Sequence, residues 1–246
     1  MLPAWKNSKG RRKGIAMGVS EMSGTLSLIE KAMVALGIPM PLVRVCECGD
    51  QRVRIFRASM KFFQTTRTMY EFFGAFYICI DLNGKHGAMC LDLGKPLLPE
   101  FDEKLIGSFN LVTNFGTIEH VKEGQMQAFA NVHDLCTVGG IMVHCVPHVS
   151  FVHGDWQYTT EWFENLVAAQ GYEIVFMEVT DKDEIWKRVP PERRPTGWTH
   201  NMSRATYVNC ILRKMTAIPF DEKAWIDPQR SPVRGRTWGH DQADHK

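Results

Sequence analysis

Two kinds of hydrophobic pattern alternate along most of the chain. Apolar residues recur at helical spacing from Glu21 to Leu36, and Gly37 and Pro39 end that segment. Runs rich in apolar and β-branched residues follow, separated by further segments of helical spacing. The expected strands are residues 42–49, 76–84, 87–94, 109–116, 141–147, 172–179 and 204–215. The expected helices between them are residues 54–73, residues 121–136 and a capped segment from Thr159 or Thr160 to Gly171.

Strands that alternate with helices predict an α/β fold, Rossmann-like and doubly wound, with a mostly parallel sheet of seven strands. The last two expected strands have no helix between them, so the last strand should insert antiparallel. A single domain is expected over residues 20–215, including the N-terminal helix. Residues 1–19 are expected to form a flexible basic arm and residues 216–246 an irregular tail, since neither shows a sustained period.

Composition and charge narrow the class of protein. The chain of 246 residues is 44% apolar and 23% charged, as is ordinary for a soluble globular protein. The formal net charge of +2 is too small to indicate nucleic acid binding, and nothing beyond the arm forms a basic, aromatic groove. The basic residues from Lys6 to Lys13 could touch phosphate or lipid headgroups, although a solvated terminus is favoured. No run approaches the ~20 apolar residues that span a bilayer.

The chain has seven cysteines, an odd number, and no CxxC pair. Six of them fall in strand-like runs: Cys46, Cys48, Cys79, Cys90, Cys145 and Cys210. This placement favours buried free thiols in a reducing compartment over disulfides. Cys46 and Cys48 point to the same face of one strand, so a place in the core is expected rather than a metal. No apolar segment of a secretory signal follows the basic N-terminus, and the expected location is the cytoplasm.

Acidic residues stand at the carboxyl ends of three expected strands. Glu47, Asp81 and Asp92 each end a strand-like run, and open α/β sheets bind ligands outside those ends. One carboxylate can hold a ribose diol, a second can accept from the amino group of adenine, and a third attracts a cationic amino acid. S-adenosylmethionine has all three features and is the expected cofactor.

Three sequence segments strengthen this interpretation. FNLVTNFGTIEHV at residues 109–121 ends a strand at Gly116 and then presents Glu119 and His120. With GGIMVHCVP at residues 139–147 and VCECGDQ at residues 45–51, it resembles the class I S-adenosylmethionine-dependent methyltransferases of types 11 and 12. The resemblance implies methyl transfer to a small-molecule or saccharide acceptor at a hydroxyl oxygen. It also implies that the Glu119–His120 pair begins the helix after the fourth strand.

The resemblance gives roles to residues at the first two strand ends. Glu47 would face the methionine amino group, Gly49 would let the backbone approach the cofactor, and Asp81 would bind the ribose. Gln51 stands where the family usually has a second glycine. The loop must therefore take another route or accommodate a side chain.

Further positions follow from the same resemblance. Asp92 and Leu93 would lie beside the adenine, and Asn114 and Phe115 would flank the transferring methyl group. Asp81 and Asp92 are only 11 residues apart, so the usual helix between their strands is expected to shrink to a loop. The complete expected cofactor-binding set is Glu47, Gly49, Gln51, Asp81, Leu82, Asp92, Leu93, Asn114 and Phe115.

A hydroxyl acceptor must lose its proton, which requires a general base that titrates near neutral pH. His120 is the first candidate, followed by His148 and His153 beyond the fifth strand. His120 bonded to the backbone at a helix start is the structural alternative. Glu119 could orient a histidine or join it on a divalent metal, as in quinone O-methyltransferases that this segment resembles. No ligand spacing fixes a metal site, so none is expected.

Two other functions compete with the enzyme. A catalytically silent, methyltransferase-like module that binds cofactor or a partner is favoured by Gln51 and disfavoured by the polar strand ends. A nicotinamide dehydrogenase is weaker, because no G-x-G-x-x-G opens the first helix. The excursion over residues 181–203 either recognises an anionic or sugar acceptor or is a surface loop. Its candidate contacts are Trp186, Arg193, Arg194 and Trp198.

Overall fold

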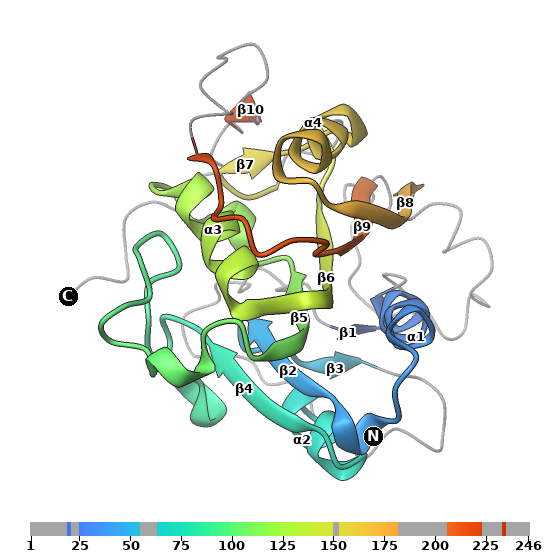
Figure 1. Cartoon of the computed structure of the whole chain (residues 1–246), viewed down its shortest axis with the longest axis vertical. Helices are drawn as coiled ribbons and strands as arrows, with labels where there is room; N and C mark the ends of the chain where they lie inside the picture. Colours follow the sequence, from blue (N-terminus) through green and yellow to red (C-terminus); the bar gives the residue numbers. More distant parts are fainter. Residues whose placement is uncertain are drawn as a thin grey trace, which may run out of the picture.

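A single six-stranded sheet organises the chain. The computed structural model describes residues 19–20, 25–54, 63–149, 153–181, 206–222 and 233–234. The sheet has the order β4-β2-β5-β6-β9-β8 (Figure 1). Its strands are β2 Arg44–Cys48, β4 Phe76–Ile80, β5 Phe109–Phe115, β6 Cys136–Pro147, β8 Glu173–Asp181 and β9 Thr206–Arg213. Strands β4, β2, β5 and β6 pair in parallel, whereas β9 pairs antiparallel with β6 and β8. The predicted mostly parallel sheet with an antiparallel last strand is confirmed.

The prediction of seven strands is wrong. Residues 87–94 form no strand, and only Met89 joins the sheet, through a single parallel bridge to Ile80. A parallel neighbour requires a crossover of a dozen or more residues. The segment after Ile80 is shorter than that and folds through the 3-10 turn Lys85–Gly87 (η3) instead. The sheet therefore ends at β4 on this side.

In the described part of the chain, four α-helices cover the two faces of the sheet (Figure 1). They are α1 Thr25–Leu36, α2 Thr66–Phe72, α3 Gln125–Leu135 and α4 Thr160–Gln170. Leu28 of α1 and Tyr70 of α2 share one core cluster with Leu111 of β5. Phe129 of α3 shares the other cluster with Val112 of β5 and with α4. Because neighbouring residues of a strand point to opposite faces, β5 serves both layers.

Local signals predicted two of these helices well. The helix expected from Glu21 to Leu36 is α1, described from Thr25 onward. At the start of α4, Thr159 Oγ1 accepts a hydrogen bond from Trp162 N at 3.0 Å, and Gly171 ends the helix at φ 64°. The helix expected over residues 54–73 is borne out only in α2. Strand β3, Val53–Arg54, stands at its start, and residues 55–62 lie outside the described residues.

Helix α3 begins later than expected. The Glu119–His120 pair does not open it but lies in a separate 3-10 turn, Ile118–His120 (η5). Gly124 precedes α3 in the left-handed conformation, at φ 76°. A Cβ at Gly124 would overlap the backbone of Gly94, so this close approach requires glycine. The break between η5 and α3 is therefore set by a contact distant in sequence.

Two short strand pairs and the cysteines complete the fold. Strand β1, Val19–Ser20, pairs with β3, and β7, Trp156–Gln157, pairs with β10, Val233–Arg234. All seven cysteines are free. Cys46 and Cys48 lie in the core as predicted, but Cys90 is exposed because its segment forms no strand. Within the described part of the chain, none of the helices has the length and apolar character needed to cross a membrane.

Candidate functional site

The strand order reverses between β2 and β5. Strand β2 leads outward to β4 on one side, and β5 leads to β6 on the other. Such a topological switch point is where open α/β sheets bind ligands, outside the carboxyl ends of the strands. The loops that leave those ends are joined by backbone hydrogen bonds. Gly49 N donates to Ile80 O at 2.8 Å, and Gly116 N donates to Cys145 O at 3.0 Å.

The side chain of Gln51 crosses the switch point, from the loop after β2 to the turn after β5. Gly49 adopts the left-handed conformation at φ 95°, and a Cβ there would overlap Thr117 Oγ1, so only glycine fits. Gln51 is buried, and its Nε2 donates to Thr117 Oγ1 at 3.1 Å. The Gln51 side chain thus bridges the loop after β2 and the turn after β5. This bridge occupies the position where a second glycine was expected to leave space.

Asp81 fastens the loop after β4 to the loop after β2. Its carboxylate accepts from Asp50 N at 2.7 Å and from Asn83 N at 2.8 Å. Asp50 Oδ2 also lies 2.5 Å from His86 Nδ1. A carboxylate offers about four acceptor sites, so the half-buried Asp81 retains some for a ligand. Leu82, beside it, is 67% exposed.

Asp92 and Leu93 lie where the missing strand would have ended. Asp92 Oδ1 accepts from Gly94 N at 2.9 Å, and Asp92 Oδ2 lies 3.7 Å from Lys95 Nζ. Leu93 is buried in the core, and its carbonyl accepts from Asn131 Nδ2 of α3 at 2.8 Å. The Asp92 carboxylate is therefore partly exposed on a segment that α3 anchors.

Glu47 is satisfied inside the protein. Its Oε2 accepts from Tyr77 OH at 2.6 Å and from Thr66 Oγ1, and its Oε1 accepts from Thr113 Oγ1 at 3.4 Å. Burial raises the pKa of Glu47 to about 7, although the hydrogen bonds from Thr66 and Tyr77 oppose the rise. This carboxylate joins β2 to α2 and β4. Its contact with a methionine amino group stays a prediction, one that these hydroxyl partners do not favour.

Asn114 shapes the turn after β5. It is fully buried, and its Oδ1 accepts from Thr117 N at 3.2 Å and from Ile118 N at 3.1 Å. Its Nδ2 lies 3.4 Å from His144 Nδ1. Phe115 is buried in the core cluster that α1 and α2 cover. The structure thus gives Asn114 a positioning role at the switch point and Phe115 a place in the core.

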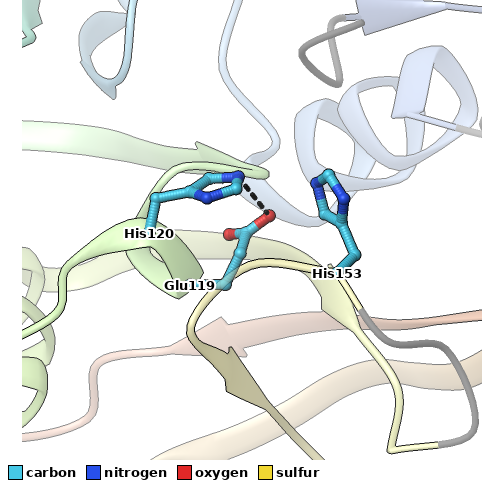
Figure 2. A group of neighbouring side chains, drawn as sticks. All are labelled: Glu119, His120 and His153. Carbon is cyan, nitrogen blue, oxygen red and sulfur yellow. Dashed lines mark ion pairs between the residues drawn. The ribbon is translucent and has the colours of Figure 1, made fainter. Parts of the chain in front are cut away.

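Glu119, His120 and His153 converge beyond the ends of β5 and β6. Figure 2 shows the Glu119 carboxylate directed toward His120, with His153 on its other side. Glu119 Oε1 lies 3.9 Å from His120 Nε2, and the two imidazole rings meet edge to face at 5.0 Å between centroids. One donor atom from each residue lies within 4.8 Å of the others. Of the predicted catalytic residues, these three form one cluster.

The Glu119 carboxylate is unusual in having no hydrogen-bond partner. Glu119 is 0% exposed, and neither of its carboxylate oxygens accepts a hydrogen bond. Burial raises the pKa of Glu119 to about 8. The backbone holds it in place, since Asp155 N donates to Glu119 O at 2.8 Å. A Cβ on Gly154 would lie 2.7 Å from Glu119 Cγ, so glycine is needed for this approach.

The histidines differ in their surroundings. Burial lowers the pKa of His120, and Asp155 opposes that shift. Burial also lowers the pKa of His148. His148 N donates to Thr206 O at 3.0 Å at the end of β6, and His148 is not part of the three-residue cluster. A neutral imidazole can accept a proton from a substrate, and a neighbouring carboxylate can stabilise the imidazolium that forms, so the His120–Glu119 pair suits acid–base chemistry.

Sequence reasoning did not single out Thr117, Gly154 or Asp155. Thr117 receives the Gln51 amide, and Gly154 and Asp155 hold Glu119. The small Gly154 between His153 and Asp155 is the one local signal for this packing. The excursion residues Trp186, Arg193, Arg194 and Trp198, like the basic arm from Lys6 to Lys13, lie outside the described residues.

Comparison with known proteins adds evidence on the fold. No protein-family model matches the chain, and no curated protein matches it significantly. The solved 1,6-didemethyltoxoflavin-N1-methyltransferase of Burkholderia thailandensis, with bound 1,6-didemethyltoxoflavin and S-adenosylhomocysteine, superposes with a TM-score of 0.50 at 13% identity. The match covers 80% of this chain and 79% of that one. This chain has the fold of the class I S-adenosylmethionine-dependent methyltransferases.

Two further methyltransferases superpose less closely. One from Mesorhizobium loti has a TM-score of 0.43 at 14% identity, covering 78% of this chain and 97% of its own. A Haemonchus contortus phosphoethanolamine N-methyltransferase 2 has a TM-score of 0.45 at 13% identity, covering 78% and 52%. The superposition on the Burkholderia thailandensis enzyme, together with the strand order, confirms the predicted methyltransferase fold, with six strands in place of seven.

Proposed function

We propose that this chain binds S-adenosylmethionine at the switch point between β2 and β5 and transfers its methyl group to a small-molecule hydroxyl. The acid–imidazole cluster beside that switch point, with Glu119 buried and His120 exposed, carries the proposal, because Glu119, His120 and His153 lie at the same edge of the sheet as Gly49 and Asp81. A fold alone hosts many functions. A converging acid–base cluster at its ligand edge supports catalysis.

Each part of the site has a definite task in this reaction. The half-buried Asp81 would hold the ribose diol, and Gly49 would let the backbone approach the cofactor. His120 would take the proton of the acceptor hydroxyl, with Glu119 beside it. The acceptor oxygen then forms a bond to the methyl carbon as the carbon–sulfur bond breaks, and the electron pair of that bond goes to sulfur. Alignment and exclusion of water supply most of the rate.

Calorimetric titration with S-adenosylhomocysteine tests the cofactor site. Wild-type protein is expected to bind at micromolar concentration, and Asp81→Asn to bind at least tenfold more weakly, since hydrogen bonds to a charged group contribute about 1.5–3 kcal/mol. Asp102→Asn is the matched control, because Asp102 only caps the 3-10 turn Glu103–Leu105. Absence of both binding heat and thermal stabilisation would remove the proposal.

The Gln51 bridge favours a second function, a catalytically silent module. Its buried amide spans the two strand ends between which the cofactor would lie. Such a module would bind S-adenosylhomocysteine weakly or not at all and would release none from S-adenosylmethionine with any hydroxylated acceptor. Acceptor-dependent release that His120→Ala abolishes would exclude it.

A further inference from the structure

The cluster of Glu119, His120 and His153 carries the donor atoms of a transition-metal site. It offers one carboxylate oxygen and two imidazole nitrogens, all within 4.8 Å of one another. Glu119 Oε1 and His120 Nε2 are 3.9 Å apart. A tetrahedral zinc ion with bonds of about 2 Å to both atoms would hold them about 3.3 Å apart, so a shift of roughly 0.6 Å would bring this pair to that spacing. Figure 2 shows His153 on the far side of the carboxylate, in position to supply the third ligand.

A second, independent observation points to a bound cation. The Glu119 carboxylate is fully buried, and neither oxygen has a hydrogen-bond partner. Burying an unpaired carboxylate costs several kcal/mol unless it binds a proton or a cation. Among the described residues, no lysine or arginine forms an ion pair with Glu119, and the basic groups that approach it are the imidazoles of His120 and His153.

The chain keeps this carboxylate in place by specific packing. Asp155 N donates to the backbone oxygen of Glu119 at 2.8 Å, and Gly154 packs against its side chain. The same segment begins with His153, so the contacts that hold Glu119 also bring the third donor. On the other side, Asn114 fixes the turn that carries Glu119 and His120. Both ligand-bearing segments are thus anchored to β5 and to each other.

We propose that Glu119, His120 and His153 bind one divalent transition-metal ion, with zinc the ion that best fits these donors. Two imidazoles and one carboxylate suit zinc and iron better than magnesium or calcium, which prefer oxygen ligands. Three protein ligands leave a coordination position open, as in catalytic rather than structural zinc sites. The described residues place the site beside the switch point, at the end where an acceptor would lie.

The open position has a use in methyl transfer, and this part rests on the proposed function. With the ion bound, His120 is a ligand and no longer the general base, and an acceptor hydroxyl at the open position would lose its proton to solvent more readily, because a bound cation lowers the pKa of its oxygen ligand. The oxygen then forms its bond to the methyl carbon as the carbon–sulfur bond breaks toward sulfur. Binding of the ion itself does not depend on methyl transfer and is measured without cofactor.

Zinc titration of the full chain tests the proposal. Metal-free protein carrying Cys90→Ser competes for Zn²⁺ with a chromophoric chelator. The substitution removes the one exposed thiol among the seven cysteines. One equivalent of Zn²⁺ is expected to bind. Glu119→Gln and His153→Ala should each weaken binding at least tenfold, whereas His86→Ala, which removes an exposed histidine paired with Asp50, should leave it unchanged. Glu119→Gln removes the ionisable carboxyl group without changing the size of the side chain, so the folded state should persist.

The outcomes separate this site from the cofactor site. No stoichiometric binding, or equal binding in Glu119→Gln and His153→Ala, would overturn the metal site. S-adenosylhomocysteine is titrated into the same samples. Zinc binding without S-adenosylhomocysteine binding would leave the metal site standing and remove the methyltransferase proposal. S-adenosylhomocysteine binding without zinc binding would remove the metal site and leave the proposed cofactor site standing.

Discussion

Replacing Glu47 by glutamine tests how the acidic residue at the end of β2 affects stability. Glu47→Gln keeps the size of the side chain and an acceptor oxygen for Tyr77 and Thr66, but removes the ionisable group. Burial raises the pKa of Glu47 from 4.5 to about 7, so the folded protein binds this proton more tightly than the unfolded chain does. The resulting stability is fully present below about pH 4.5 and is lost as the pH rises through about 7.

The magnitude follows from that rise in pKa. At 1.36 kcal/mol for each pKa unit, a rise from 4.5 to about 7 corresponds to about 3 kcal/mol, of which roughly 2–3 kcal/mol falls between pH 5 and pH 8. Over this interval the free energy of unfolding of the wild type should fall by that amount more than that of Glu47→Gln. Urea denaturation followed by tryptophan fluorescence measures both. Glu119, whose pKa burial raises to about 8, is present in both proteins and cancels.

Equal pH dependence of the two proteins would refute the reasoning. It would mean that the surrounding donors compensate fully for the loss of water around the Glu47 carboxylate. Thr113→Val is a suitable control, because it removes only the longest of the three hydroxyl hydrogen bonds, at 3.4 Å. The free energy of unfolding of this variant should still fall between pH 5 and pH 8.

Three further predictions concern a glycine at a close contact and two side chains that accept hydrogen bonds from the backbone. Gly49→Ala should lose about 2 kcal/mol or more of unfolding free energy and its affinity for S-adenosylhomocysteine, because its Cβ would overlap Thr117. Gly139→Ala, at φ 80° with nothing within 4 Å, measures the strain without the overlap. Asn114→Ala should lose about 2 kcal/mol in urea denaturation, since two buried N–H groups lose their acceptor, and Asn114→Asp should recover most of it. Thr159→Ala should cost about 1 kcal/mol and leave S-adenosylhomocysteine binding unchanged in calorimetry.

The parts of the fold set by local chemistry were predictable from sequence. Thr159 and Gly171 mark the ends of α4 because a capping hydroxyl and a left-handed glycine act within one turn. Residues 87–94 have the composition of a strand but only reach the sheet at Met89, because chain length rather than composition limits a crossover. The start of α3 depends on Gly124 meeting Gly94, a contact that no local pattern encodes.

The site divides in the same way. Glu119, His120 and His153 each stood out as chemistry-bearing residues after a strand, yet only the return of the segment through Asp155 brings them together. Glu47 shows the opposite case. A strand-end acid in the sequence indicates a ligand contact, but three hydroxyl groups from separate elements surround it in the fold. Side-chain partners from distant segments decide which acidic residue faces a ligand.

The Gln51 bridge is too weak to decide between the enzyme and the silent module by itself. One hydrogen bond, from Gln51 Nε2 to Thr117 Oγ1 at 3.1 Å, holds it closed. Such a bond contributes about 0.5–1.5 kcal/mol net, whereas micromolar cofactor binding supplies about 8 kcal/mol. Breaking the bridge would therefore lower the affinity by roughly tenfold. Only the buried volume of the Gln51 side chain, which must move or be bypassed by the cofactor, could abolish binding. If the site does not bind the cofactor, the cause would thus be the space that Gln51 fills in the loop after β2, and not the hydrogen bond from Gln51 to the turn after β5.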